Sequence, residues 1–161
     1  ISACLVGSEM CIRDRLMATR WPQRVQGLVV MAPHLFVEDV TVQNIERARE
    51  AYEQTDLRHK LGRYHDDVDS AFWGWNRIWL DPAFRTWNIE PEVAQIRAPV
   101  LAIQGCDDEY GTLAQIRGIA QRVPGTRLLE LPDCAHSPHR DQPDAVVAAA
   151  VAFIQAHHTP A

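Results

Sequence analysis

The sequence lacks the features that mark several large classes of protein. Only four of its 161 residues are cysteine, and their scatter excludes a disulfide scaffold and favours a reduced, cytoplasmic protein. The longest apolar runs, near 28–32 and 146–154, fall short of the roughly 20 residues of a membrane span, so we expect no membrane partner. Acidic residues outnumber basic ones by 21 to 16, and without a basic run we expect no nucleic-acid partner.

Three short apolar runs predict the strands of a parallel β-sheet. They span residues 25–33, 99–105 and 126–132, and their continuous apolar character indicates burial on both faces. A helical pattern over 112–123 connects the last two runs, and the Ala- and Val-rich stretch 145–156 predicts a final helix. The expected fold class is therefore α/β with a parallel sheet.

The middle of the chain has a different composition. Residues 35–88 are polar, helical in pattern and rich in aromatics, which predicts a helical cap inserted between core segments 16–34 and 89–161. Trp75 and Trp79 could line a substrate pocket beneath such a cap. The alternative is that these tryptophans pack the cap helices against one another.

Polar side chains follow the predicted strands where each strand ends. Asp108 follows the run at 99–105, and His136 follows the run at 126–132. Parallel strands lie about 5 Å apart and end at one edge, so these two side chains are expected to form a hydrogen bond where open α/β sheets bind ligands. Asp107 is the alternative acid, and His34, after the first strand, could contact substrate at the same edge.

These residues resemble the last third of the α/β-hydrolase superfamily. The resemblance covers roughly 16–154 and rests on a strand ending in Gly105-Cys-Asp-Asp108, then Ala135-His-Ser-Pro-His139 and Asp141-Gln-Pro143. It implies a triad that runs Ser, Asp, His along the chain, with Asp108 as acid and His136 as base. It further implies serine-esterase-type hydrolysis of a small ester or related carbonyl substrate, with no cofactor and no metal.

The nucleophile is where the sequence departs from the family pattern. The family serine sits in Gly-x-Ser-x-Gly, whereas Ser8, near the expected position, has Val6 and Met10 at the two glycine positions. Residues 4–15 resemble a translated sequencing adapter, so we interpret residues 1–15 as a non-native segment. The native elbow and the N-terminal strands of the sheet would then be missing from this chain. Cys11 and Cys106 are expected to be inert.

Several alternatives remain open at this stage. Dehalogenases and epoxide hydrolases of the same fold use an aspartate at the elbow, and the sequence does not exclude them. The chain could instead be a truncated, non-catalytic fragment or a pseudo-enzyme. A metal site at Cys134, His136 and His139 is disfavoured because no further ligands stand at a recognised spacing. The oligomeric state is not indicated.

Overall fold

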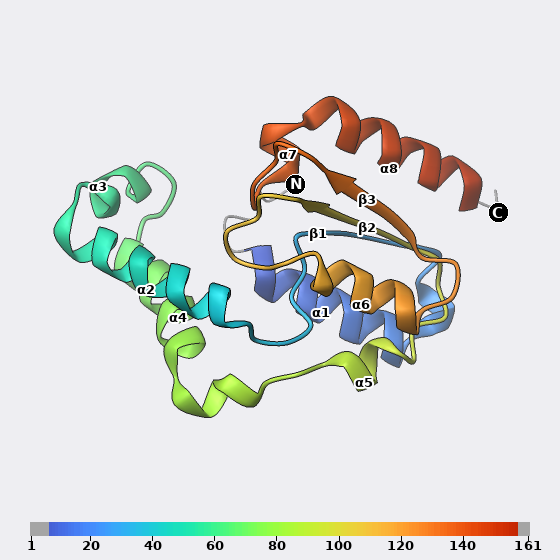
Figure 1. Cartoon of the computed structure of the whole chain (residues 1–161), viewed down its shortest axis with the longest axis horizontal. Helices are drawn as coiled ribbons and strands as arrows, with labels where there is room; N and C mark the ends of the chain where they lie inside the picture. The colour runs from blue at the N-terminus through green and yellow to red at the C-terminus, as the bar shows by residue number, and fades with distance from the viewer. Residues whose placement is uncertain (1–6, 158–161) are drawn as a thin grey trace. The chain divides into compact units, whose positions relative to one another are not determined.

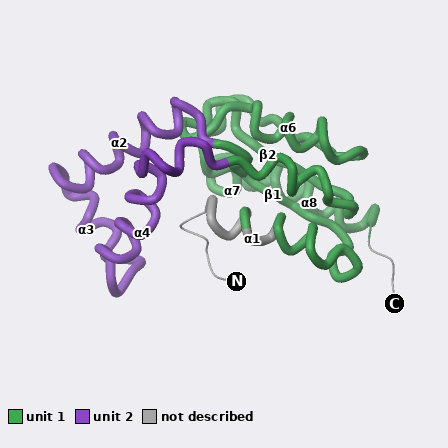
Figure 2. Tube along the Cα trace, turned by 90° about the horizontal axis from the view of Figure 1, so that it is seen from below, with its two compact units in different colours: residues 1–36, 88–161 green, residues 37–87 purple. Residues whose placement is uncertain are grey.

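The chain folds into two compact units. The computed structural model describes residues 7–157, apart from the side chains of residues 7–11, 13 and 14. The core unit comprises residues 1–36 and 88–161, and the helical unit comprises residues 37–87 (Figure 2). The helical unit lies within the segment 35–88 predicted as a cap, and its role as a cap stays a prediction.

The core unit is built on a small parallel sheet. Over the described residues its strands run in the order β1-β2-β3, with Leu28 of β1 opposite Val100 of β2 and Leu101 opposite Arg127 of β3. The predicted α/β class with a parallel sheet is confirmed. The elements of this unit are α1 (Gly7–Arg20), η1 (Pro22–Arg24), β1 (Leu28–Met31), α5 (Glu90–Val93), β2 (Val100–Gly105), α6 (Ala114–Arg122), β3 (Arg127–Leu131), α7 (Pro138–Asp141) and α8 (Pro143–His157).

Helices cover both faces of this sheet. Helix α8 lies on one face, and α1, α5 and α6 lie on the other (Figure 1). On the α8 face, Leu101 and Ile103 belong to a buried apolar cluster that includes Phe153 of α8. Every position of β2 is buried, as the continuous apolar run predicts for a central parallel strand. Burial of each large apolar side chain contributes about 1.5–3 kcal/mol, so the side chains of Leu101 and Ile103 stabilise the sheet.

The third strand is less buried than the sequence indicated. Arg127 and Leu128 are exposed, and only Leu131 of β3 is fully buried. The expectation of burial on both faces was wrong here because β3 pairs with β2 alone and forms an edge of the described sheet. An edge strand needs fewer apolar contacts than a central one.

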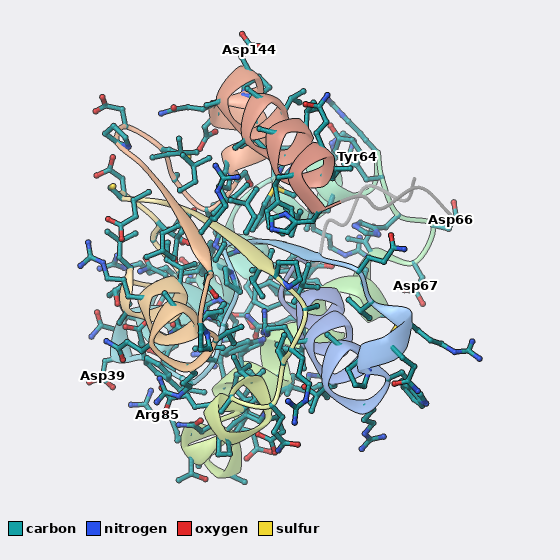
Figure 3. All side chains as sticks on the ribbon, turned by 90° about the vertical axis from the view of Figure 1, so that its right-hand side faces the viewer. Asp39, Tyr64, Asp66, Asp67, Arg85 and Asp144 are labelled. Carbon is teal, nitrogen blue, oxygen red and sulfur yellow. The ribbon has the colours of Figure 1, made fainter. Side chains whose placement is uncertain are left out.

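The helical unit is held together by aromatic stacking and ion pairs. Tyr52 stacks on Phe72 with ring centroids 3.8 Å apart, and its hydroxyl donates to Asp69 at 2.6 Å. Asp39 and Arg85 form an ion pair (Figure 3). The elements of this unit are α2 (Asp39–Gln54), α3 (Leu57–Leu61), α4 (Val68–Leu80) and η2 (Pro82–Thr86).

The two segments that connect the core unit to residues 37–87 leave it side by side. Phe36 and Asn88 form an antiparallel bridge, and the Ile89 N–H donates to the Leu35 carbonyl at 2.8 Å. The buried amide of Gln115 accepts from the Leu35 N–H at 2.6 Å and donates to the Phe36 carbonyl at 3.2 Å. The junction is therefore fixed by backbone pairing and by one side chain of α6.

None of the helices within residues 7–157 has the length and apolar character needed to cross a membrane.

Gly105, the last residue of β2, lies where the loops after β2 and β3 meet. A Cβ atom at this position would lie 1.9 Å from the Cys134 carbonyl oxygen, far inside contact distance. Because glycine has no Cβ, the Cys106 N–H can donate to Leu131 O at 2.8 Å and the Asp107 N–H to Cys134 O at 3.0 Å. The missing side chain is therefore what lets the two loops approach.

Substitution of Gly105 by alanine should destabilise the protein, because the added methyl group must push the two loops apart. We expect a loss of about 1–3 kcal/mol or more in the free energy of unfolding, measured by urea denaturation. Gly74 of α4 is the matched control, since a Cβ there meets nothing within 4 Å. Gly74→Ala should stabilise by about 0.5–1 kcal/mol. Equal effects of the two substitutions would contradict the role given to Gly105.

Candidate active site

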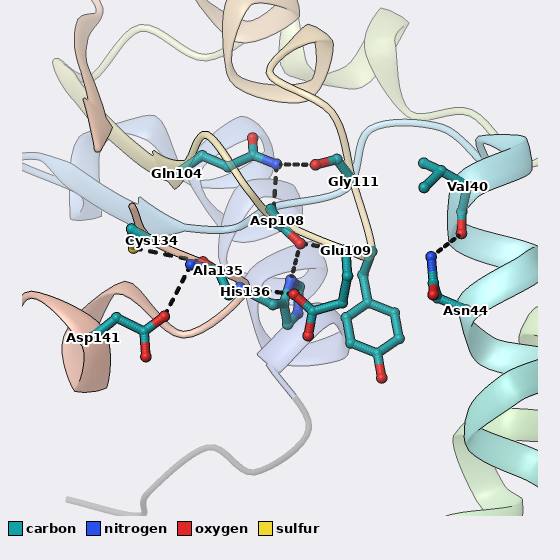
Figure 4. Close-up of polar contacts among 11 residues, drawn as sticks. Val40, Asn44, Gln104, Asp108, Glu109, Gly111, Cys134, Ala135, His136 and Asp141 are labelled. Carbon is teal, nitrogen blue, oxygen red and sulfur yellow. Dashed lines mark hydrogen bonds and ion pairs between the residues drawn. The ribbon is translucent and has the colours of Figure 1, made fainter. Parts of the chain in front are cut away.

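Asp108 and His136 lie together at the carboxyl ends of β2 and β3. His136 Nδ1 is 2.9 Å from Asp108 Oδ1 (Figure 4). The Asp108 side chain is 1% exposed and that of His136 is 25% exposed. Because an ionised carboxylate only accepts, the proton between them belongs to Nδ1, and Nε2 is left as the ring's acceptor. The pair expected from the sequence is present, while its catalytic role stays a prediction.

Two further donors hold the Asp108 carboxylate. Oδ1 also accepts from the Tyr110 N–H at 2.9 Å, and Oδ2 accepts from Gln104 Nε2 at 3.0 Å. Burial raises the pKa of Asp108, but the hydrogen bond and charge of His136, with the two other donors, outweigh burial and leave the pKa below its usual value. Asp108 is therefore ionised at neutral pH.

The loop that carries His136 is fastened by carboxylates on two sides. The His136 N–H donates to Glu109 Oε2 at 3.2 Å, and the neighbouring Ala135 N–H donates to Asp141 Oδ2 at 2.9 Å (Figure 4). The Tyr110 ring meets the imidazole edge to face, with centroids 4.9 Å apart. These contacts fix both the backbone and the ring of His136. Asp107, the alternative acid, is exposed and has its backbone N–H bonded to Cys134 O.

His34 lies at the same edge of the sheet, after β1. Ala32 has a φ of 44°, a left-handed conformation that redirects the chain after the strand. The His34 ring is buried, 3% exposed, with its centroid 6.0 Å from that of His136. Burial, followed by the charge of His136, lowers the pKa of His34 to about 3, so its imidazole is neutral. Its predicted contact with substrate stays a prediction.

The two tryptophans predicted to contact substrate pack within the helical unit. Trp79 is 3% exposed and meets Phe84 and Trp87 edge to face, with centroids 5.2 and 5.9 Å away. Trp75 is partly buried and meets Phe72 at 5.3 Å. These contacts fit the alternative role of holding the helices of this unit together. Substrate contact by Trp75 and Trp79 stays a prediction.

The nucleophile predicted at Ser8 falls on α1, but its side chain lies outside the described residues, as does that of Cys11. Cys106 is exposed, and burial raises the pKa of the Cys134 thiol. No group of three His, Cys, Asp or Glu side chains in the part of the chain that the structure describes is arranged to hold a metal ion.

A cavity of about 670 Å³ borders the loop after β2 and the start of α6. Asp108 contributes to its lining, together with Phe36, Cys106, Leu113 and Arg117. The volume lies within the range typical of small-molecule sites. The cavity is therefore large enough for a small molecule beside the acid of the pair.

Sequence reasoning missed four residues of this site. Gln104, Glu109 and Asp141 bond respectively to the Asp108 side chain and to the N–H groups of His136 and Ala135. Tyr110 donates its N–H to Asp108 and packs its ring against His136. Gln104 carries a signal that could have identified it, since it is a polar residue in an otherwise apolar buried strand. Glu109 and Asp141 carry no such signal, because exposed loop carboxylates are common.

Solved structures share this fold. The serine hydrolase CarC, involved in carbazole degradation, superposes with a TM-score of 0.70 at 15% identity over 93% of this chain. Rv0554 from Mycobacterium tuberculosis superposes with a TM-score of 0.65 at 23% identity over 92% of this chain. The enol-lactonase from Burkholderia xenovorans LB400 superposes with a TM-score of 0.62 at 22% identity over 92% of this chain. The chain spans only 62%, 63% and 63% of the lengths of these three proteins, respectively.

A comparison with curated proteins found no match. The model of one family, described as the alpha/beta hydrolase family, matches residues 2–150, which is most of the chain. The parallel sheet and the strand-end loops agree with that match. The chain belongs to the α/β-hydrolase family.

Proposed function

We propose that this chain carries the acid and base of a serine-esterase-type hydrolase that acts on a small ester or related carbonyl compound. The observation that carries the proposal is the 2.9 Å contact between His136 Nδ1 and the buried carboxylate of Asp108. It fixes the imidazole with Nε2 free to accept a proton, which is the state that a general base requires.

In the first half-reaction, His136 Nε2 removes the proton of the nucleophile's hydroxyl as that oxygen bonds to the substrate carbonyl carbon. The carbonyl becomes an oxyanion, and the imidazolium is stabilised by the ionised Asp108. As the oxyanion collapses, the bond to the leaving alcohol breaks, and Nε2 returns its proton to that alcohol. Ser8 is the candidate nucleophile of this chain.

In the second half-reaction, water replaces the alcohol. His136 Nε2 takes a proton from the water as its oxygen attacks the acyl carbon, then returns the proton to the nucleophile's oxygen as the acid product leaves. The same pair thus acts twice, and His136 ends in its starting state.

The position of His34 supports His136 as the base. Both imidazoles lie at the same edge, but the pKa of His34 is lowered to about 3, mainly by burial. A group that resists protonation so strongly cannot hold the nucleophile's proton at neutral pH. His136 differs in being partly exposed and paired with a carboxylate, which stabilises its imidazolium.

One solved relative is named as an enol-lactonase, and a lactone is a cyclic ester. Another is named as a serine hydrolase. Their likeness to this chain supports the fold, while the reaction is inferred from the Asp108–His136 pair.

Hydrolysis of p-nitrophenyl acetate, followed by nitrophenolate release, tests the proposal. His136→Ala should reduce kcat/KM by roughly 10⁴-fold or more, because no other group takes the proton. Asp108→Asn should also reduce kcat/KM by about 10⁴-fold, because the amide favours the imidazole tautomer with its proton on Nε2. His139→Ala is the control, since this exposed histidine lies three residues away and should change little.

Ser8→Ala completes this series and should abolish turnover if Ser8 is the nucleophile. Absence of ester turnover by the unaltered chain would overturn the proposal for this polypeptide and favour the non-catalytic alternative. Release of halide from haloalkanes, without ester turnover, would assign the chain to the branch with an aspartate nucleophile.

The neutral state of His34 predicts how stability depends on pH. Its pKa falls from 6.5 in the unfolded chain to about 3 in the folded protein, so the unfolded state binds more protons between these values. The contribution of neutral His34 to the free energy of unfolding is therefore complete above pH 6.5 and is lost as the pH falls towards 3. As the pH falls through this window, the free energy of unfolding of the unaltered protein should decrease by up to about 1.4 kcal/mol more per pH unit than that of the His34→Gln variant.

Urea denaturation at several pH values between about 4 and 7 measures this difference. Asp108, whose pKa is lowered, contributes a loss of the same sign at more acidic pH in both proteins, so it cancels in the comparison. Identical pH profiles for the two proteins would show that folding does not lower the pKa of His34.

A further inference from the structure

The side chain of Gln104 is completely buried directly behind the Asp108–His136 pair. Gln104 is the last residue before Gly105 in β2, and its neighbours Ala102 and Ile103 are apolar. Its Nε2 donates to Asp108 Oδ2 at 3.0 Å and to the Gly111 carbonyl at 2.7 Å (Figure 4). Burial of a polar side chain costs free energy unless hydrogen bonds compensate, and the Nε2 group of Gln104 forms both of its bonds to this loop.

The chemistry of the two partners fixes the orientation of the Gln104 amide. A carboxylate oxygen and a backbone carbonyl oxygen only accept hydrogen bonds at neutral pH, so the NH₂ group must face them. Both N–H bonds of Nε2 are then used, one for the acid and one for the loop. The amide therefore ties Asp108 to the far end of its own loop.

We infer that Gln104 is a positioning residue, which holds the Asp108 carboxylate in the orientation that keeps the His136 proton on Nδ1. The inference rests on the proposed function, because it concerns the same acid and base. It goes beyond that function by assigning the orientation of the acid to a buried amide outside the Asp108–His136 pair.

The geometry explains why Oδ2 needs a partner. Oδ1 accepts from His136 Nδ1 and from the Tyr110 N–H, and Oδ2 accepts from Gln104. Rotation of an aspartate carboxylate about its last bond is otherwise soft. Donors on both oxygens stop this rotation. Without Gln104, the carboxylate can turn, and the bond to Nδ1 loses its alignment.

The bond to Gly111 supports the same role. A Cβ at Gly111 would lie 3.4 Å from Gln104 Nε2 and 3.2 Å from His34 Cε1, so the loop closes tightly over these buried side chains. Residues 108 and 111 are thus held by one nitrogen atom. The loop carries the carboxylate, and Gln104 sets the position of both.

Gln115 provides a matched control. Like Gln104, it is completely buried and its amide forms two hydrogen bonds. Both go to the backbone, at Leu35 N and Phe36 O. These two bonds hold the segment at Leu35 and Phe36, not the loop that carries Asp108. Loss of the Gln115 amide should therefore lower stability without affecting the acid–base pair.

The test is ¹⁵N NMR of histidine-labelled protein above the pH range in which histidine titrates, with the His136 signals assigned by their absence from His136→Ala. The unaltered chain should show a His136 ring with its proton on Nδ1, protected from exchange. Gln104→Met, which keeps the length of the side chain but removes the donor, should lose this protected proton and move the ring towards the Nε2–H tautomer. Gln115→Met should keep the original His136 signals.

Retention of the Nδ1–H tautomer and its protection in folded Gln104→Met would overturn the inference, as would an equal loss in Gln115→Met. If Gln104→Met does not fold, Gln104→Asn serves instead, because its amide is one methylene too short to span both acceptors. Absence of the Nδ1–H form in the unaltered chain would remove the pair itself and the proposed function with it. If the unaltered chain shows the Nδ1–H form but the variants do not behave as expected, only the role of Gln104 is overturned and the proposed function stands.

Discussion

The arrangement of this site depends on a close approach of two backbone segments. Parallel strands end at one edge, but an acid and a base on neighbouring strands can touch only if the loops that carry them also meet. Gly105 permits this, because any side chain there would overlap the Cys134 carbonyl. The hydrogen bonds from Cys106 and Asp107 to the β3 side follow from that contact, and Asp108 is delivered to His136.

Around this contact, burial gives different protonation states to similar groups. Burial opposes charge on both Asp108 and His34. For Asp108 the hydrogen bonds and the charge of His136 outweigh burial, whereas for His34 burial prevails. Asp108 stays ionised, and His34 stays neutral. His136, by contrast, is a quarter exposed and paired with the carboxylate. Two imidazoles whose centroids lie 6.0 Å apart thus have different surroundings, one buried and one partly exposed beside a carboxylate.

Apolar periodicity predicted the strands, their parallel arrangement and the edge shared by Asp108 and His136, because buried strands and their order are encoded in local patterns. Side-chain partners in loops are not encoded in this way. Glu109 and Asp141 reach the His136 loop through a backbone that includes Asp133 at a φ of 51°, which sequence patterns do not indicate. The packing of Trp79 against Phe84 and Trp87 depends on helix contacts that composition alone could not resolve. The side chain of Ser8 lies outside the described residues.

The paired exit at Phe36 and Asn88 has a consequence for how such chains diversify. Residues 37–87 enter and leave the core unit through two neighbouring positions, fixed to each other and to Gln115. An insertion anchored in this way can be lengthened, shortened or exchanged without changing the register of the strands beneath. Residues 37–87 can therefore change in length and sequence without disturbing the strand-end loops that carry Asp108 and His136.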